Sequence, residues 1–298
     1  MTKREKWAFL NISRLHIAAI AAMGVFTFGW LFTGRYPWLL TIVVALDWYI
    51  VNLANRIADL KEDQANFTTG TAFLIRHRRK LLVGTISALG LSIVVVHLIQ
   101  PAITCLRIFG HLLGVFYSWP LPPKKKRLKE LYFWKNTSSA LGFLITVFGY
   151  PLAAAYYNNN FFQFPAGISW MTVLFSCVFF FLFEVSYEII YDLRDIKGDT
   201  LAGLKTYPVV HGELAAVYII DILLFCSIFT LSLGYLLNIV PWRIFIMSGA
   251  PVLQFIVYKK ALRRGISTGD CILVTWLGVS MFMIFHLWVL ADLPGVKS

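Results

Sequence analysis

Long apolar runs separated by short polar connections make up almost the whole chain. A run of roughly 17 to 25 apolar residues is long enough for an α-helix to cross the hydrocarbon core of a bilayer. These runs predict nine membrane-spanning helices, at residues 9–33, 37–58, 82–99, 101–118, 136–156, 167–190, 213–236, 241–259 and 270–291. We therefore predict an all-α polytopic membrane protein, with residues 1–298 in a single transmembrane domain.

The composition supports this class and bears on the partners. Hydrophobic residues make up 58% of the chain and charged residues only 14%, a balance outside the ordinary soluble range. The formal net charge of +12 is large enough to suit nucleic acid, but the basic residues lie in short connections between apolar runs. That placement is typical of membrane topology signals. We expect membrane lipids around the protein, no nucleic-acid partner and no required protein partner.

The basic residues also predict an orientation. On one side of the membrane the predicted connections carry only Arg35, Arg243 and Lys297, whereas the connections on the other side carry most of the remaining Lys and Arg residues. Lys and Arg are retained on the cytoplasmic side. The N-terminus is therefore expected in the cytoplasm and the C-terminus outside. Two groups of four helices, 9–118 and 136–259, then form a weak parallel repeat, followed by 270–291.

Two acidic segments stand at the predicted cytoplasmic ends of helices. Asn55, Asp59 and Asp63 are spaced by four residues, which places them one above another on a helix. Asp192, Asp195 and Asp199 follow another long apolar run and share one helical face in the same way. Mg²⁺ prefers oxygen ligands and typically takes one or two carboxylates together with phosphate oxygens. The two segments therefore predict a site that holds a diphosphate through Mg²⁺.

The two segments resemble the paired aspartate motifs of the UbiA superfamily of intramembrane prenyltransferases. The similarity extends to Tyr117-Ser118-Trp119, which precedes a basic cluster, and to Gly203-Leu204-Lys205-Thr206 after the second motif. One difference is Arg56, where many members have a second acid after the asparagine. The resemblance implies nine helices around a central cavity that opens to the bilayer. It also implies Mg²⁺-dependent transfer of an isoprenyl group from a polyprenyl diphosphate to an aromatic or other lipophilic acceptor.

This resemblance, together with the chemistry of the side chains, defines a candidate site. The expected catalytic residues are Asp59, Asp63, Asp192, Asp195 and Asp199. The expected metal ligands are Asp59, Asp63, Asp195 and Asp199, with Asn55 and Asp192 as further candidates. The expected substrate-binding residues are Asn55, Lys61, Arg194, Lys205, Lys129, Tyr117, Tyr191 and Arg14. For the basic residues, a role as topology signals at the lipid headgroups remains the competing interpretation.

Ionisable residues within the predicted spans need a partner or a function, because burying a charge in a membrane is costly. Glu184 and Glu188 continue the second acidic stripe inward, and Asp47 lies two turns inside Asn55. We expect Arg14 or Arg107 to lie in the cavity and either pair with one of the buried acids or orient an acceptor carboxylate. Asp221, in another span, is expected in a structural ion pair.

Three functions fit the acidic segments. Transfer to an acceptor is the first, and the acceptor fits equally as an aromatic ring or a lipid alcohol. A membrane terpene cyclase of the same superfamily would ionise the same diphosphate without an acceptor. An ion-coupled transporter would instead use its acids near the middle of the membrane. The acids here lie at helix ends, which favours the first two functions.

Overall fold

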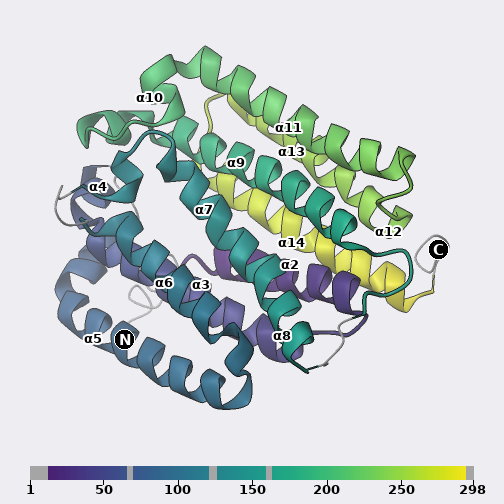
Figure 1. Ribbon diagram of the computed structural model, residues 1–298. Helices are drawn as coiled ribbons and strands as arrows, with labels where there is room; N and C mark the ends of the chain where they lie inside the picture. Colours follow the sequence, from purple (N-terminus) through teal and green to yellow (C-terminus); the bar gives the residue numbers. More distant parts are fainter. Residues whose placement is uncertain (1–12, 66–69, 121–125, 159–162, 293–298) are drawn as a thin grey trace.

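The computed structural model describes residues 13–65, 70–120, 126–158 and 163–292, with the backbone alone at 61, 62, 65 and 158. Figure 1 shows a bundle of long helices that run roughly side by side. The long helices are α2 (Leu15–Thr33), α3 (Trp38–Ala58), α5 (Thr71–Ile99), α6 (Thr104–Ser118), α7 (Trp134–Leu144), α9 (Trp170–Leu201), α11 (Glu213–Leu236), α13 (Gly249–Leu262) and α14 (Thr268–Leu290). The shorter elements are α4 (Leu60–Ala65), η1 (Pro101–Ile103), η2 (Leu128–Glu130), η3 (Ile145–Gly149), α8 (Tyr150–Asn158), α10 (Tyr207–His211), α12 (Trp242–Phe245) and η4 (Ile246–Ser248).

The helices agree with the predicted polytopic membrane fold. Among the described residues, eight helical segments are long and apolar enough to cross a membrane. The remaining predicted span, 241–259, is also helical but consists of three consecutive pieces, α12, η4 and α13. The prediction of an all-α polytopic fold is therefore confirmed, although the segment at 241–259 is not a single α-helix.

Two helix boundaries differ from the prediction. Helix α5 begins at Thr71, so the polar stretch up to Lys80 forms its first turns and the prediction that this stretch is a loop is wrong. Helix α9 continues through the second acidic segment to Leu201, beyond the predicted end at residue 190. Both added parts contain Lys and Arg, which are good helix formers. Hydropathy therefore locates the apolar part of each helix and misses the polar turns that extend the helix beyond it.

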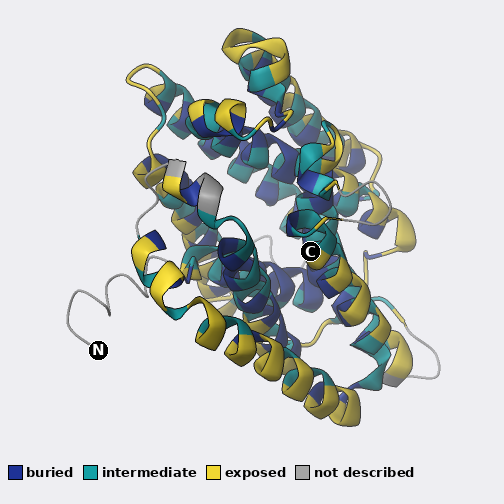
Figure 2. Ribbon diagram, turned by 90° about the vertical axis from the view of Figure 1, so that its left-hand side faces the viewer, coloured by how far each residue is buried: buried dark blue, intermediate teal, exposed yellow. Residues whose placement is uncertain are grey.

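A large core cluster is built mainly from residues of α2, α3, η3 and α9. The rings of Phe28 and Phe148 lie 4.7 Å apart between centroids, and those of Phe148 and Phe180 lie 5.5 Å apart. The outer face of α5 is different, since Leu91 is 68% exposed and Leu98 is 78% exposed. Figure 2 shows exposed residues along the outer helices and buried residues on the faces turned inward. Apolar side chains on the outside of a bundle are expected where lipid replaces water.

A π-helical turn, η3, joins α7 to α8 beside the candidate site. Pro151 follows it and has no backbone N–H, so it offers no hydrogen bond to the carbonyl of Val147. Within η3, the Thr146 hydroxyl donates to the carbonyl of Gly142 at 3.0 Å and accepts from the Trp48 indole N–H at 3.1 Å. Short π-helical turns within α-helices are frequent at functional sites. The η3 turn positions Thr146 and Trp48 in the wall of a cavity.

Candidate active site

The first acidic segment lies at the junction of α3 and α4. Helix α3 ends at Ala58, and the N–H of Asp59 donates to the carbonyl of Asn55 at 2.9 Å. The N–H of Asp63 donates in turn to the carbonyl of Asp59 at 2.9 Å. Asn55, Asp59 and Asp63 thus occupy successive turns, as predicted from their spacing. The helix is interrupted at Asp59, whereas the spacing alone predicted one continuous helix.

Basic side chains hold the carboxylates of the first segment. The Lys129 ammonium, which is buried, donates to Asp59 Oδ1 at 2.7 Å, and an Arg127 guanidinium nitrogen lies 3.7 Å from the same oxygen. The Arg56 guanidinium donates to Asp63 Oδ1 at 3.0 Å. Arg56 is therefore the counter-ion of Asp63 in this chain.

The second acidic segment lies within α9, and one lysine links two of its carboxylates. Lys135, in the first turn of α7, donates to Asp192 Oδ1 at 2.8 Å and to Asp199 Oδ2 at 2.9 Å. The Asn136 amide donates to the other oxygen of Asp192 at 2.8 Å. Arg194 forms an ion pair with its neighbour Asp195. Every carboxylate of the two segments thus has a basic partner.

The two segments lie at the same end of the bundle. Helix α4 packs against α9, and Figure 1 shows α4 and α10 at that end, with the C-terminus at the opposite one. The end of α6 is joined to the first segment, because the Ser118 hydroxyl donates to Asn55 Oδ1 at 3.0 Å. Together the six polar side chains form what we call the acidic cluster, which consists of Asn55, Asp59, Asp63, Asp192, Asp195 and Asp199.

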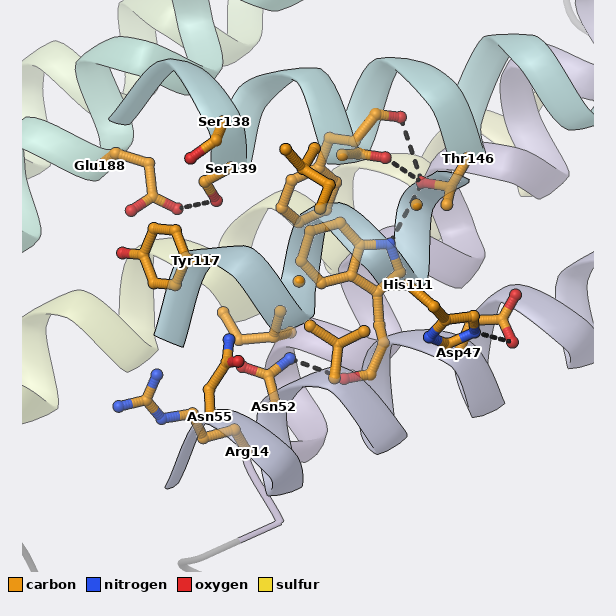
Figure 3. A pocket seen from close by; sticks show the side chains of 18 of the residues that line it. Arg14, Asp47, Asn52, Asn55, His111, Tyr117, Ser138, Ser139, Thr146 and Glu188 are labelled. Atoms are coloured by element: carbon orange, nitrogen blue, oxygen red, sulfur yellow. Dashed lines mark hydrogen bonds and ion pairs between the residues drawn. The ribbon is translucent and has the colours of Figure 1, made fainter. Parts of the chain in front are cut away.

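A cavity of about 150 Å³ extends inward from the acidic cluster. Its lining near the cluster includes Asn55, Tyr117 and Tyr191, and its walls include Trp48, whose ring stacks on Phe143 at 3.9 Å between centroids. Figure 3 shows Tyr117 and Asn55 at one end of the cavity and Asp47 at the other. Aromatic walls suit a reactive carbocation.

The inner end of the cavity is polar. Asp47 accepts hydrogen bonds from Arg107 Nε at 3.0 Å, from His111 Nε2 at 3.1 Å and from the Tyr150 hydroxyl at 3.2 Å. Arg107 is only 1% exposed and also donates to the Ser92 carbonyl at 3.0 Å. We call Asp47, Arg107, His111 and Tyr150 the polar floor. The sequence predicts that Arg107 either pairs with a buried acid or orients an acceptor carboxylate. The structure shows the first of these, because Arg107 pairs with Asp47.

The remaining residues predicted for the site lie partly in the cavity and partly outside it. Arg14 lines the cavity near Asn55, and the guanidinium of Arg194 lies 4.8 Å from the centre of the Tyr191 ring. Lys205 is exposed in the turn between α9 and α10, and the side chain of Lys61 lies outside the described part of the chain. The predicted structural ion pair of Asp221 is confirmed, since Lys259 donates to it at 2.6 Å.

Sequence reasoning missed Lys135 and Asn136 as members of the site. Lys135 is one of a series of basic residues after the fourth predicted span, where the charge pattern suggested a topology signal. Asn136, fully buried, was treated as the first residue of an apolar run. An amide at that position is itself a signal, since a buried polar side chain needs partners.

The donor atoms fit Mg²⁺. Within the described residues, no three Asp, Glu, His or Cys side chains lie close enough together to hold a metal ion by themselves. The available donors are carboxylate and amide oxygens, including the buried Asn136 Oδ1, which has no hydrogen-bond partner in the described part of the chain. Mg²⁺ keeps several waters and completes its shell with substrate phosphates, so it does not need a full set of protein ligands.

Comparison with known proteins identifies relatives. The sequence profile of the UbiA prenyltransferase family matches residues 12–285. Digeranylgeranylglyceryl phosphate synthase from Methanopyrus kandleri is 31% identical over 86 residues, which is 29% of this chain and 30% of that protein. The enzyme of the same name from Natronomonas pharaonis is 31% identical over 112 residues, 37% of this chain and 38% of its own. The chain thus aligns with about a third of each of these curated relatives.

Comparison with a solved structure shows that the fold is similar over nearly the whole chain. A UbiA homologue from Archaeoglobus fulgidus, in a structure bound to GPP and Mg²⁺, superposes with a TM-score of 0.70 at 16% identity. The superposition covers 95% of this chain and 99% of that one. The profile match, which runs through both acidic segments and nearly all predicted spans, and the shared fold lead to one assignment. This chain belongs to the UbiA prenyltransferase family and has the helices of a multi-pass membrane protein.

Proposed function

We propose that the protein transfers an isoprenyl group from a polyprenyl diphosphate to a lipophilic acceptor within the membrane, with Mg²⁺ as cofactor. The observation that carries the proposal is the position of the two acidic segments, which are adjacent to each other and lie next to an aromatic-walled cavity lined by Asn55 and Tyr191. A diphosphate is soluble in water and its isoprenyl chain in lipid. A polar rim above a cavity with aromatic walls matches that division.

The acidic cluster is the proposed binding site for the cofactor and the diphosphate. Asp59, Asp63, Asp195 and Asp199 would hold Mg²⁺, with Asn55 and Asp192 as additional ligands. When bound, Mg²⁺ neutralises the charge that develops on the departing diphosphate. The diphosphate oxygens would also accept charge-assisted hydrogen bonds from Lys61, Lys129, Arg194, Lys205 and Arg14.

The cavity walls would protect the allylic cation that forms when the diphosphate leaves. Tyr117 and Tyr191 line the cavity beside the cluster, and Trp48 lines its wall. The faces of aromatic rings attract cations, by roughly 2 kcal/mol or more when water is excluded. A dry cavity also keeps water from capturing the cation.

A lipid alcohol is the acceptor that we favour over an aromatic ring. Both curated relatives described above are named digeranylgeranylglyceryl phosphate synthase. Arg14 lines the cavity and, within the described part of the chain, forms no ion pair. A guanidinium in this position suits the phosphate of a glyceryl phosphate lipid. We therefore propose a prenylglyceryl phosphate, or a lipid alcohol of the same kind, as the acceptor.

We also propose that the acidic cluster faces the cytoplasm, with the N-terminus on the same side and the C-terminus outside. The distribution of Lys and Arg supports this orientation. Helix α2 begins beside the cluster, and α14 ends at the opposite end of the bundle. A cytoplasmic site would draw its diphosphate from the soluble pool of metabolites.

The test is diphosphate release by the purified protein in detergent. It uses Mg²⁺ and a series of isoprenyl diphosphates, with and without a panel of lipid alcohols and aromatic acids. We expect release only when a lipid alcohol is present, together with a prenylated product. Asp59→Ala and Asp195→Ala should lose most of this activity and remain folded. Release that needs no acceptor, with a hydrocarbon product, would instead establish a terpene cyclase.

A further inference from the structure

Glu188 is an acid in the cavity that the proposed diphosphate site does not use. It lies on α9, four residues before Asp192 and therefore about 6 Å deeper along the helix. Its Oε1 accepts a hydrogen bond from the Ser139 hydroxyl at 2.6 Å, and Figure 3 shows this pair at the same end of the cavity as Tyr117. Glu188 is thus placed just below the acidic cluster, with its carboxyl group in the cavity.

The partners of Glu188 distinguish it from the acidic cluster and from the other acid that lines the cavity. Each carboxylate of the acidic cluster has a basic partner, and Asp47, the other acid that lines the cavity, pairs with Arg107. Within the described part of the chain, Glu188 forms no ion pair, and its hydrogen-bond partner is the neutral Ser139. A carboxyl group at membrane depth that no direct ion pair neutralises is costly, which points to a function.

The proposed reaction needs a proton acceptor at this depth. Transfer to a hydroxyl group releases a proton, and a cavity that excludes water offers no solvent to take it. The reacting carbon of the isoprenyl chain is bonded to the diphosphate, so it lies close to the acidic cluster. The polar floor is too deep, because Asp47 precedes Asp59 by twelve residues, about 18 Å along a helix. Glu188 lies within one turn of the cluster.

We propose that the Glu188 carboxylate is the general base for a hydroxyl acceptor, a role that rests on the proposed function. The bond between C1 of the isoprenyl chain and the diphosphate oxygen breaks, and its electron pair leaves with the diphosphate. The acceptor oxygen forms a new bond to C1, and its proton moves to Glu188. Ser139 holds Oε1, which leaves Oε2 for the acceptor hydroxyl. The ionisable side chains that surround Glu188 are those of Asp192, Lys135, Arg14 and Glu184.

The experiment compares an alcohol with a more acidic nucleophile. Wild-type protein and Glu188→Gln are assayed with geranylgeranyl diphosphate, Mg²⁺ and a prenylglyceryl phosphate, and then with the analogue in which a thiol replaces the hydroxyl. General-base catalysis contributes about 10² to 10⁴-fold. We expect Glu188→Gln to lose about 10²-fold or more with the alcohol, and much less with the thiol, which ionises without help. Mg²⁺-dependent binding of pyrophosphate should be unchanged.

A second variant distinguishes loss of the base from a folding defect. Glu188→Ala should also lose transfer to the alcohol, and added formate should restore part of it, since formate supplies the missing base. Ser139→Ala is the matched control in the same cavity and should lose less, because the carboxylate remains. Equal losses with alcohol and thiol, or no rescue by formate, would overturn the assignment of Glu188. If wild-type protein transfers to neither nucleophile but still binds pyrophosphate, the proposed acceptor class itself is wrong.

Discussion

Replacing Lys135 by methionine tests how the second acidic segment is held together. The Lys135 ammonium lies 2.8 Å from an oxygen of Asp192 and 2.9 Å from an oxygen of Asp199. All three side chains are largely buried, with exposures of 12%, 3% and 8% respectively. Methionine keeps the length and most of the volume of the side chain and removes the charge. The variant therefore leaves two carboxylates close together without a cation between them.

The expected cost follows from the burial. Removing one partner from a buried ion pair typically costs about 3 to 5 kcal/mol. The residual exposure of Lys135 places the effect at the lower end of that range. For a chain of this size, a loss of about 3 kcal/mol lowers the melting temperature by roughly 6 °C. Mg²⁺ with pyrophosphate should raise the melting temperature of the variant more than that of the wild type, because the added cation restores the missing charge.

The assay is thermal unfolding in detergent, with and without Mg²⁺ and pyrophosphate. Lys259→Met is the matched control, since the Lys259 and Asp221 side chains are 30% and 29% exposed. This pair is less buried than the pairs of Lys135, so its loss should cost less and should shift the melting temperature by a smaller amount. Equal shifts for the two variants would refute the reasoning. A larger response of the wild type to Mg²⁺ would also contradict it.

Three further predictions concern the cofactor, the polar floor and the cavity. Removing Mg²⁺ with EDTA should abolish diphosphate release, and excess Mg²⁺ should restore it; activity that survives chelation would exclude a metal requirement. Asp47→Leu and Arg107→Leu should each destabilise the protein by about 3 to 5 kcal/mol, whereas the double variant should cost less than either. Additive losses in unfolding would show that the pair is not coupled. Gly110→Leu should reduce kcat/KM for the longest isoprenyl diphosphate by about 10-fold, because Gly110 lines the cavity and a Cβ there meets no heavy atom within 4 Å. An unchanged preference for chain length in product analysis would place the isoprenyl chain elsewhere.

The sequence by itself determined the class of the protein and the identity of its acidic segments. Runs of about 20 apolar residues are a local property, because each helix satisfies its own backbone hydrogen bonds in the membrane. The spacing of Asn55, Asp59 and Asp63 is equally local, since residues four apart on a helix are neighbours whatever the rest of the chain does. Features of this kind can be predicted without knowledge of tertiary contacts.

The tertiary structure decided which charges meet. Lys129 contacts Asp59 across 70 residues of sequence, Lys135 contacts Asp199 across 64, and Arg107 contacts Asp47 across 60. No local rule fixes such pairs, because they depend on how helices pack against one another. The same packing places Glu188 in the cavity beside Ser139, so that the face of α9 that carries Glu188 lines one side of the cavity. Helical spacing sets which residues share a face, and only packing sets what that face contacts.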